Sequence, residues 1–194
     1  MSINIACLKN QKKITIVFVN DDPFDIAEML IKKFHDSERV IFIDYGIGLH
    51  EEAVVEKLVK DFEKGQDCLV MPCVKEGLDW DKIKTNILTK SSEPVEQAGM
   101  DFDTEVGDHM RDCMYEVSKT TPRLYAIDCE RTVELLKNRK KPKIFLPPNR
   151  TEMFEKFMEK KINIYAYTKA KVVIAYQHES IGKITEAYGL SKSS

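Results

Sequence analysis

The sequence predicts one α/β domain over residues 1–190, with a mostly parallel but mixed sheet flanked by helices and a frayed tail over residues 191–194. The first half of the chain alternates short apolar runs with amphipathic helical patterns, which is typical of parallel strands joined by helices. Each run is almost continuously apolar, as expected for strands buried on both faces. No internal repeat or long linker interrupts the 194 residues, and this length is enough for one sizeable core.

The composition is that of an ordinary globular protein, with 43% hydrophobic and 32% charged residues. A net charge of -2 provides no basic field to attract nucleic acid or an anionic membrane. No apolar run approaches the roughly 20 residues that span a bilayer, and the N-terminus lacks the apolar segment of a signal peptide. We therefore expect a cytoplasmic protein without a membrane span or a nucleic-acid partner.

The 5 cysteines are odd in number and form no C-x-x-C pair. Three of them, Cys7, Cys68 and Cys73, stand in apolar, strand-like runs. This pattern predicts reduced, mostly buried thiols and argues against a disulfide or zinc framework. A Cys-His nucleophile pair has no local support.

Two apolar runs open the chain, Ile3–Leu8 and Ile14–Val19, and both are expected to be strands. The second run leads into a helix that Asp22 can cap and that Pro23 begins, because proline suits the first helical position. The next strand is predicted over Val40–Ile43.

A helix with its apolar face over residues 54–62 follows, and Gly65 is expected to end it. The run Cys68–Val74 predicts another strand. Asp79 then precedes a helical pattern in which Trp80 belongs to the inward-facing stripe.

Residues 90–122 are weakly periodic and contain several glycines and prolines, which predicts a long irregular segment of the kind that often carries function. The elements expected after it are a strand Leu124–Ile127, a helix Glu130–Lys137, a basic turn over 138–143, a short strand Ile144–Leu146, a helix capped by Thr151, strands Ile162–Tyr167 and Val172–Tyr176, and a helix Ile181–Tyr188. The two last strands could form a hairpin.

Polar residues follow several of the predicted strands, and ligands in such folds bind beyond the carboxyl ends of the strands. These residues are Asn20, Asp21 and Asp22, then Asp44, and finally Gln177, His178 and Glu179. Carboxylates with one imidazole suit a hard cation such as Mg²⁺ or Mn²⁺, especially where phosphate oxygens complete the coordination shell. The structural alternative treats Asp21, Asp22 and His178 as turn and cap residues.

Asp79 and Asp81 form a D-x-D at a strand exit and are a second candidate position for a cofactor. The alternative is structural, because Asp79 stands where a helix N-cap belongs and Asp81 in the first helical turn, where the helix dipole favours anions.

The segment over residues 91–110 is rich in acidic residues and glycine. A bond-forming site needs a carboxylate as general base, and the best candidates here are Asp103 and Glu105, which stand next to Phe102 and Val106. The alternative is a solvated acidic loop without chemistry. The basic turn over 138–143 could touch phosphates, although such turns are more often only solvated.

The stretch ITIVFVNDDPFDIAEML resembles the opening of a receiver domain, in which an acidic pair after the first strand binds Mg²⁺. That family also needs a phospho-accepting aspartate at the end of a later strand. The corresponding run here, CLVMPCVKEG, ends without one.

The stretch ERVIFIDYGIGLHEEAVVEKLVKDFEKGQDCLVMPC resembles the metal-site region of GT-A-type glycosyltransferases, in which an apolar strand ends in a D-x-D and a helix leads to another strand. The later order is also similar, with an acidic glycine-containing segment, TTPRLYAID and a strand that ends in a histidine, so the likeness spans residues 38–180. The whole chain looks most like small glycosyltransferase-like domains encoded by large DNA viruses, notably those of algae. This resemblance implies a single-domain, Rossmann-like GT-A fold.

The resemblance also implies a UDP- or GDP-sugar donor, a divalent metal (Mn or Mg) and a glycan or protein-linked acceptor, in the host cytoplasm for a viral protein. By position, Asp44 matches the first aspartate of the D-x-D and His178 the C-terminal metal ligand. Residues 20–22 would lie near the nucleoside, and Asp103 or Glu105 would be the base of an inverting reaction. Gly46 stands where the second aspartate is expected. Three hypotheses follow: a glycosyltransferase, a catalytically inactive interaction or structural protein of the same fold, and a receiver-like signalling module.

Overall fold

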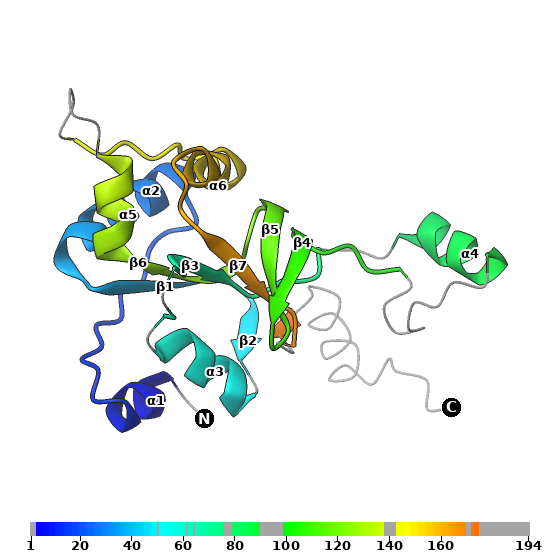
Figure 1. Ribbon diagram of the computed structural model, residues 1–194, viewed down its shortest axis with the longest axis horizontal. Helices are drawn as coiled ribbons and strands as arrows, with labels where there is room; N and C mark the ends of the chain where they lie inside the picture. Colours follow the sequence, from blue (N-terminus) through cyan, green and yellow to red (C-terminus); the bar gives the residue numbers. More distant parts are fainter. Residues whose placement is uncertain are drawn as a thin grey trace, which may run out of the picture.

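The computed structural model describes residues 3–49, 51–60, 62–63, 65–75, 79–89, 99–137, 143–169 and the backbone of 172–174. Figure 1 shows the elements in space. The helices are α1 (Ile3–Lys9), α2 (Pro23–Asp36), α3 (Glu52–Val59), α4 (Trp80–Leu88), α5 (Cys129–Leu136) and α6 (Arg150–Glu159). The strands are β1 (Arg39–Ile43), β2 (Ile47–Leu49), β3 (Cys68–Val70), β4 (Thr104–Arg111), β5 (Met114–Thr120), β6 (Leu124–Asp128), β7 (Ile164–Tyr167) and β8 (Val172–Ile174).

The main sheet has six strands in the order β1-β6-β3-β7-β5-β4, and β2 pairs with β8 in a separate two-stranded sheet. The expectation of a mostly parallel sheet is wrong, because only β3 and β7 pair in parallel among the described strands. β1 and β3 do run in the same direction, as the alternation of strands and helices predicts. The late strand β6 lies between them and is antiparallel to both. The chain is therefore α/β with a mixed sheet.

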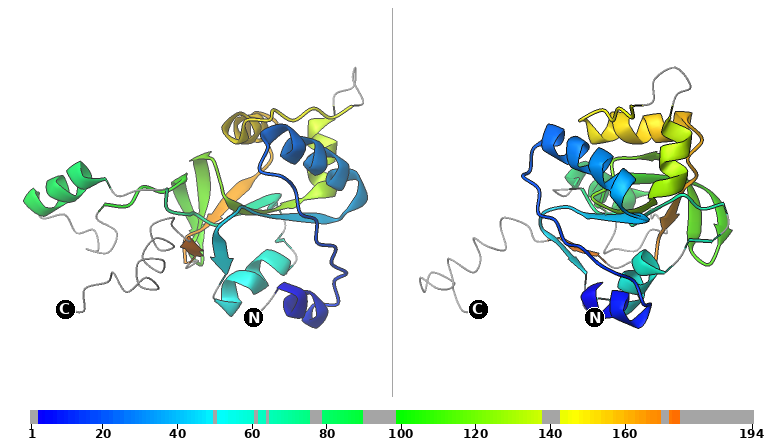
Figure 2. Two further views of the ribbon diagram at one scale, coloured as in Figure 1. Left: turned by 180° about the vertical axis from the view of Figure 1, so that it is seen from behind. Right: turned by 90° about the vertical axis from the view of Figure 1, so that its left-hand side faces the viewer.

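Helices cover both faces of the sheet, with α2, α5 and α6 on one face and α1 and α3 on the other (Figures 1 and 2). Successive residues of β6 point to opposite faces, as the period of two in a strand requires. Tyr125 packs in the core under α2, α5 and α6 together with Phe154 and Phe157, which are fully buried. Leu124 packs in the core on the side of α3 with Leu58.

The start of α2 is as predicted, because the Asp22 carboxylate accepts hydrogen bonds from the N–H groups of Phe24 and Asp25, with Pro23 at the first position. The strand expected over Ile3–Leu8 is wrong. This run is helix α1, and its buried residues Ala6 and Cys7 pack against α3.

The strand expected over Ile14–Val19 is wrong as well. This segment forms no strand, and its apolar side chains are exposed, up to 95% at Phe18. β propensity reflects how well a side chain fits a pleated, half-buried surface, and residues 13–20 make no backbone hydrogen bond to any strand that the structure describes.

Helix α4 stands apart from the sheet (Figures 1 and 2) and has no buried residue among those described. The prediction that Trp80 faces inward is wrong, since its side chain is 66% exposed. A periodic apolar stripe predicts a helix but does not say which surface it packs against.

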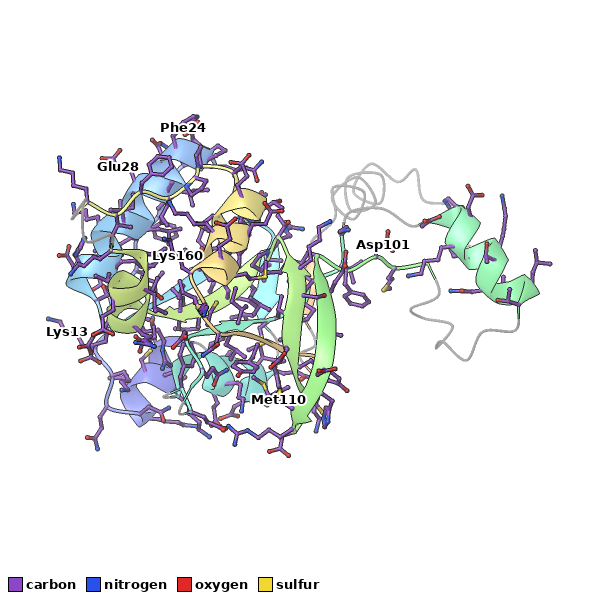
Figure 3. The ribbon with its side chains drawn as sticks, turned by 45° about the horizontal axis from the view of Figure 1, so that its top comes forward. Lys13, Phe24, Glu28, Asp101, Met110 and Lys160 are labelled. Atoms are coloured by element: carbon purple, nitrogen blue, oxygen red, sulfur yellow. The ribbon has the colours of Figure 1, made fainter. Side chains whose placement is uncertain are left out.

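Residues 90–122 are not an irregular segment throughout, because β4 and β5 form a long antiparallel hairpin. Asp112 and Cys113, with φ of 43° and 64°, make its two-residue turn, and two positive φ values are the mark of a type I′ hairpin turn. The polar strand β4 lies at the edge of the sheet and is exposed along most of its length, for example at Met110 (Figure 3). Its lack of apolar alternation hid it from the sequence pattern.

Three further expectations differ in the last third of the chain. Ile144–Leu146 forms no strand, although Ile144 and Leu146 are buried in the core. Asn149 caps α6 in place of Thr151. β7 and β8 do not form a hairpin, because β7 pairs with β3 and β5 while β8 pairs with β2.

The helix expected over 181–188, the tail and residues 138–142 of the basic turn lie outside the described residues. None of the helices that the structure describes is long and apolar enough to cross a membrane.

Candidate functional site

Asp44 lies where the sequence predicts it, directly after β1 and at the start of a tight turn. Its N–H donates to the carbonyl of Arg123 at 2.9 Å, which extends the β1–β6 ladder by one bond. The N–H of Tyr45 donates to Asp44 Oδ1 at 2.9 Å, and Gly46 takes the left-handed φ of 77° that the turn requires.

Two arginines hold the other carboxylate oxygen of Asp44. Arg150 Nη1 lies 2.8 Å and Arg123 Nε 3.4 Å from Oδ2. All three side chains are only 18–20% exposed. We call Asp44, Arg123 and Arg150 the arginine site. It lies at the carboxyl ends of β1 and β3, where the first turn of α6 meets the start of β6.

Further contacts fix the guanidinium groups of the arginine site. Arg123 Nη2 donates to the carbonyl of Tyr45 at 2.9 Å. Arg150 Nη1 also donates to the carbonyl of Pro122 at 3.3 Å, and the Arg150 guanidinium lies over the Phe42 ring at 4.9 Å. Both cations are therefore held by the backbone or an aromatic ring as well as by Asp44.

The pKa of Asp44 reflects this setting. Burial alone would raise it, but the hydrogen bond and charge of Arg150, the N–H of Tyr45 and the charge of Arg123 together lower it below the usual value. Asp44 is therefore ionised at neutral pH. The three side chains of the arginine site, two guanidinium groups and one carboxylate, carry one net positive charge, which the buried Asp103 carboxylate beside Arg123 partly offsets.

Asp103 lies close to the arginine site and connects three chain segments there. Its Oδ1 accepts from the N–H of Cys73 at 3.0 Å and from the Thr104 hydroxyl at 2.8 Å, and its Oδ2 accepts from the N–H of Arg123 at 3.2 Å. The Thr104 hydroxyl also bonds that of Thr120. Burial raises the pKa of Asp103, and these hydrogen bonds only partly oppose the rise. The carboxylate thus ties the end of β3 and the starts of β4 and β6 together.

The other described candidates make their hydrogen bonds to groups outside the arginine site. Asp22 caps α2, and Asn20 Nδ2 donates to Asp25 at 3.0 Å. Asp79 caps α4 by accepting from the N–H of Asp81 and of Lys82, as its structural alternative predicts.

Glu105 is exposed on β4 and pairs with Lys119 across the hairpin. His178, with Gln177 and Glu179, lies outside the described residues.

A divalent cation does not fit Asp44 in this arrangement. Both carboxylate oxygens already accept hydrogen bonds, and two guanidinium cations are in contact with Oδ2, so a further cation would meet like charges. Within the described part of the chain, no three His, Cys, Asp or Glu side chains are grouped to hold a metal ion.

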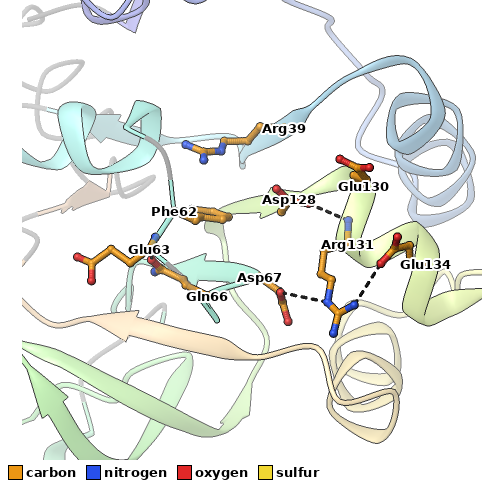
Figure 4. Close-up of a pocket in the computed structure, with 9 residues that line it drawn as sticks. All are labelled: Arg39, Phe62, Glu63, Gln66, Asp67, Asp128, Glu130, Arg131 and Glu134. Atoms are coloured by element: carbon orange, nitrogen blue, oxygen red, sulfur yellow. Dashed lines mark hydrogen bonds and ion pairs between the residues drawn. The ribbon is translucent and has the colours of Figure 1, made fainter.

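A cavity of about 380 Å³ lies at the opposite end of the sheet, near the start of β1 and the end of β6 (Figure 4). Its lining residues are Arg39, Phe62, Glu63, Gln66, Asp67, Asp128, Glu130, Arg131 and Glu134. Five carboxylates against two guanidinium groups make this cavity acidic, so it is unsuited to a phosphate. Arg39 donates to the carbonyls of Leu58, Val59 and Lys60 at the end of α3, which is a structural role.

Sequence reasoning missed Arg123 and Arg150, which lie 79 and 106 residues from Asp44 in the chain. One signal was available. Arg150 opens α6, and a cation in the first turn of a helix opposes the helix dipole. An arginine at such a position suggests a role other than helix stability.

No family model, no curated protein and no solved structure matches the chain. The class of protein therefore rests on the fold itself, an α/β domain with a six-stranded mixed sheet and helices on both faces. The resemblance to GT-A-type glycosyltransferases stays a prediction from the sequence.

Proposed function

We propose that the chain binds a UDP- or GDP-sugar at the arginine site and transfers the sugar to a hydroxyl of a glycan or protein-linked acceptor. The observation that carries the proposal is the excess of positive charge held by Asp44, Arg123 and Arg150 at the carboxyl ends of β1 and β3. Ligands of α/β sheets bind beyond such strand ends, and planar guanidinium groups match the oxygens of a phosphate.

The residues of the site fit the leaving group of a sugar transfer. In that reaction the bond between the sugar carbon and the diphosphate oxygen breaks, and negative charge develops on the diphosphate. Cations held in place before the reaction stabilise such charge without reorganising. Arg123 and Arg150 are held in this way by hydrogen bonds to Asp44, Tyr45 and Pro122.

The acceptor hydroxyl needs a carboxylate to take its proton. Asp103 accepts hydrogen bonds on both oxygens and is 8% exposed, so it suits a structural role better than proton transfer. Glu105, two residues later in the chain and on β4, is exposed and is the better candidate for the base.

A second candidate function is binding of the nucleotide without transfer. The engagement of Asp103 and the presence of Gly46 in place of a second aspartate favour it. It shares the phosphate site with the first candidate and differs from it only in turnover.

Thermal unfolding with a panel of nucleotide-sugars tests the proposal. A ligand at about 100 times its Kd stabilises the folded state by about 2.7 kcal/mol, which for a chain of this length raises Tm by roughly 5–10 °C. Uridine and guanosine, which lack phosphate, should leave Tm unchanged. No rise with any nucleotide-sugar would contradict the proposal.

Turnover separates the two candidate functions. A transferase releases UDP or GDP from the bound donor when an acceptor is present, and Glu105→Gln should abolish this release while the Tm shift is retained. A wild-type protein that binds the donor but releases no UDP or GDP would support binding without transfer.

A further inference from the structure

We propose that Arg123 and Arg150 themselves neutralise the diphosphate of the ligand, without a divalent cation at Asp44, and that Asp44 is a positioning residue for the two arginines. The inference rests on the proposed nucleotide-sugar binding and adds how the site recognises the diphosphate. It makes binding independent of metal, in contrast to what the sequence motif around Asp44 predicts.

The hydrogen bonds of Asp44 support this role. Its Oδ2 receives Arg150 Nη1 at 2.8 Å and Arg123 Nε at 3.4 Å, and its Oδ1 receives the N–H of Tyr45 at 2.9 Å. A metal ligand needs a free oxygen lone pair that points toward the cation. Here the carboxylate is surrounded by donors and cations, and its negative charge holds two guanidinium groups side by side.

The guanidinium groups retain donors for a ligand. Nη1 of Arg123, and Nε and Nη2 of Arg150, make no hydrogen bond within the part of the chain that the structure describes. Each arginine can thus be held from one side by the protein and can offer its other N–H groups to phosphate oxygens. Such charge-assisted bonds are stronger than neutral ones and are often bidentate.

The surroundings of the arginine site also favour an anion. Arg150 opens α6, whose dipole places partial positive charge at the same point. Thr121 precedes Pro122, whose carbonyl accepts from Arg150, and Thr151 follows Arg150 in the chain. The hydroxyl oxygens of the two threonines lie 2.8 Å apart, and either hydroxyl can donate to a phosphate oxygen after a small rotation. The acidic cavity lies at the far end of the sheet and would repel the same ligand.

The test compares binding of UDP, GDP and inorganic diphosphate by calorimetry, in EDTA and in Mn²⁺. We expect the wild-type protein to bind a nucleoside diphosphate in EDTA, with little gain from Mn²⁺ and with an affinity that falls as salt increases. Binding of inorganic diphosphate as well would show that the phosphates alone suffice, whereas selective binding of UDP or GDP would add contacts to the nucleoside.

Four variants sharpen the comparison. Arg150→Gln and Arg123→Gln should each weaken binding by about tenfold or more, because each removes a charged donor pair. The matched control is Arg131→Gln at the opposite end of the sheet, whose guanidinium is 53% exposed, and it should bind as the wild type does. Asp44→Asn keeps an oxygen acceptor but loses the charge that holds the two guanidinium groups together, so nucleotide binding in EDTA should weaken, and Mn²⁺ should not change it.

The outcomes distinguish this inference from the proposed function. If no ligand binds to the wild type with or without Mn²⁺, the proposed function fails. If binding requires Mn²⁺ and is lost in Asp44→Asn, nucleotide binding stands and the inference is overturned. The inference also fails if the folded Arg150→Gln and Arg123→Gln proteins bind as tightly as the control. Arg150→Lys, which keeps the charge but not the planar fork, replaces Arg150→Gln if circular dichroism shows that the latter is unfolded.

Discussion

Replacing Asp103 with alanine separates a structural role for this carboxylate from a catalytic one. Asp103→Ala leaves the N–H groups of Cys73 and Arg123 without their acceptor, while the Thr104 hydroxyl keeps its bond to Thr120. Each of these two donors left unpaired costs about 1–3 kcal/mol, so the free energy of unfolding should fall by about 2–6 kcal/mol. This is a large part of the roughly 5–15 kcal/mol that stabilises a typical domain.

Urea denaturation measures this loss. With a slope of roughly 2 kcal/mol per M, the midpoint should fall by about 1–3 M. Asp103→Asn should lose less stability than Asp103→Ala. Its amide oxygen can still accept from the N–H of Cys73, whereas its NH₂ group, also a donor, faces the N–H of Arg123 and cannot accept from it. The matched control is Asp101→Ala, two residues earlier in the chain. The Asp101 side chain is 54% exposed and forms an ion pair with Lys82, which is worth at most about 1 kcal/mol.

The pH dependence gives a second check. The pKa of Asp103 is raised in the folded state, so ionisation of this carboxyl lowers the stability of the folded protein at neutral pH. This loss of stability disappears as the pH falls through the raised pKa of the folded state toward the unfolded pKa of about 3.9. The stability difference between the wild type and Asp103→Ala should therefore grow on acidification. Asp44, whose pKa is lowered, loses its contribution only below about pH 4, and it does so in both proteins. A loss below about 1 kcal/mol in Asp103→Ala at every pH would refute the structural role.

Three other outcomes follow from burial and capping. Phe154→Ala removes a fully buried ring and should lower the free energy of unfolding by about 3–5 kcal/mol, whereas Phe18→Ser, at a 95% exposed side chain, should change it by less than about 0.5 kcal/mol in the same urea assay. Asp22→Ala removes the cap of α2 and should cost about 1 kcal/mol; an unchanged midpoint would contradict the capping role. In native protein a thiol reagent should react fastest at Cys113, which is partly exposed, and slowly at Cys73, because burial raises its pKa to about 12; equal rates would contradict this.

The parts of the fold that the sequence predicts correctly depend on neighbours a few residues away. The cap of α2 is an example, since Asp22 bonds the N–H groups two and three residues ahead of it. The order of strands depends instead on contacts between distant segments. Local patterns carry no information about β6, which enters the sheet between β1 and β3 from much later in the chain. For the same reason the apolar run Ile14–Val19 predicts a strand, although it pairs with none of the strands that the structure describes.

The site shows the same division. Asp44 stands out in the sequence because a carboxylate at the end of an apolar run is unusual, and the structure does find it at a strand end. Its partners Arg123 and Arg150 are single basic residues in unremarkable settings, and only the fold brings them to within hydrogen-bonding distance of Asp44. The chemistry of the site therefore changes from a carboxylate that attracts cations to a pair of cations that attracts anions.

Stability alone is a poor explanation of the arginine site. A largely buried ion pair gains little net free energy, because desolvation of the charges offsets their attraction. The site contains two cations for one carboxylate. The nearby Asp103 carboxylate compensates the second cation only in part, because it is occupied by hydrogen bonds from Cys73 and Thr104 as well as from the N–H of Arg123. Arg150 adds a further cost by opposing the dipole of α6. An apolar residue could pack against Phe42 without these costs. Residues that lower stability in this way occur most often at functional sites. Here the excess positive charge at the end of the sheet costs stability, and the same charge is what an anionic ligand needs.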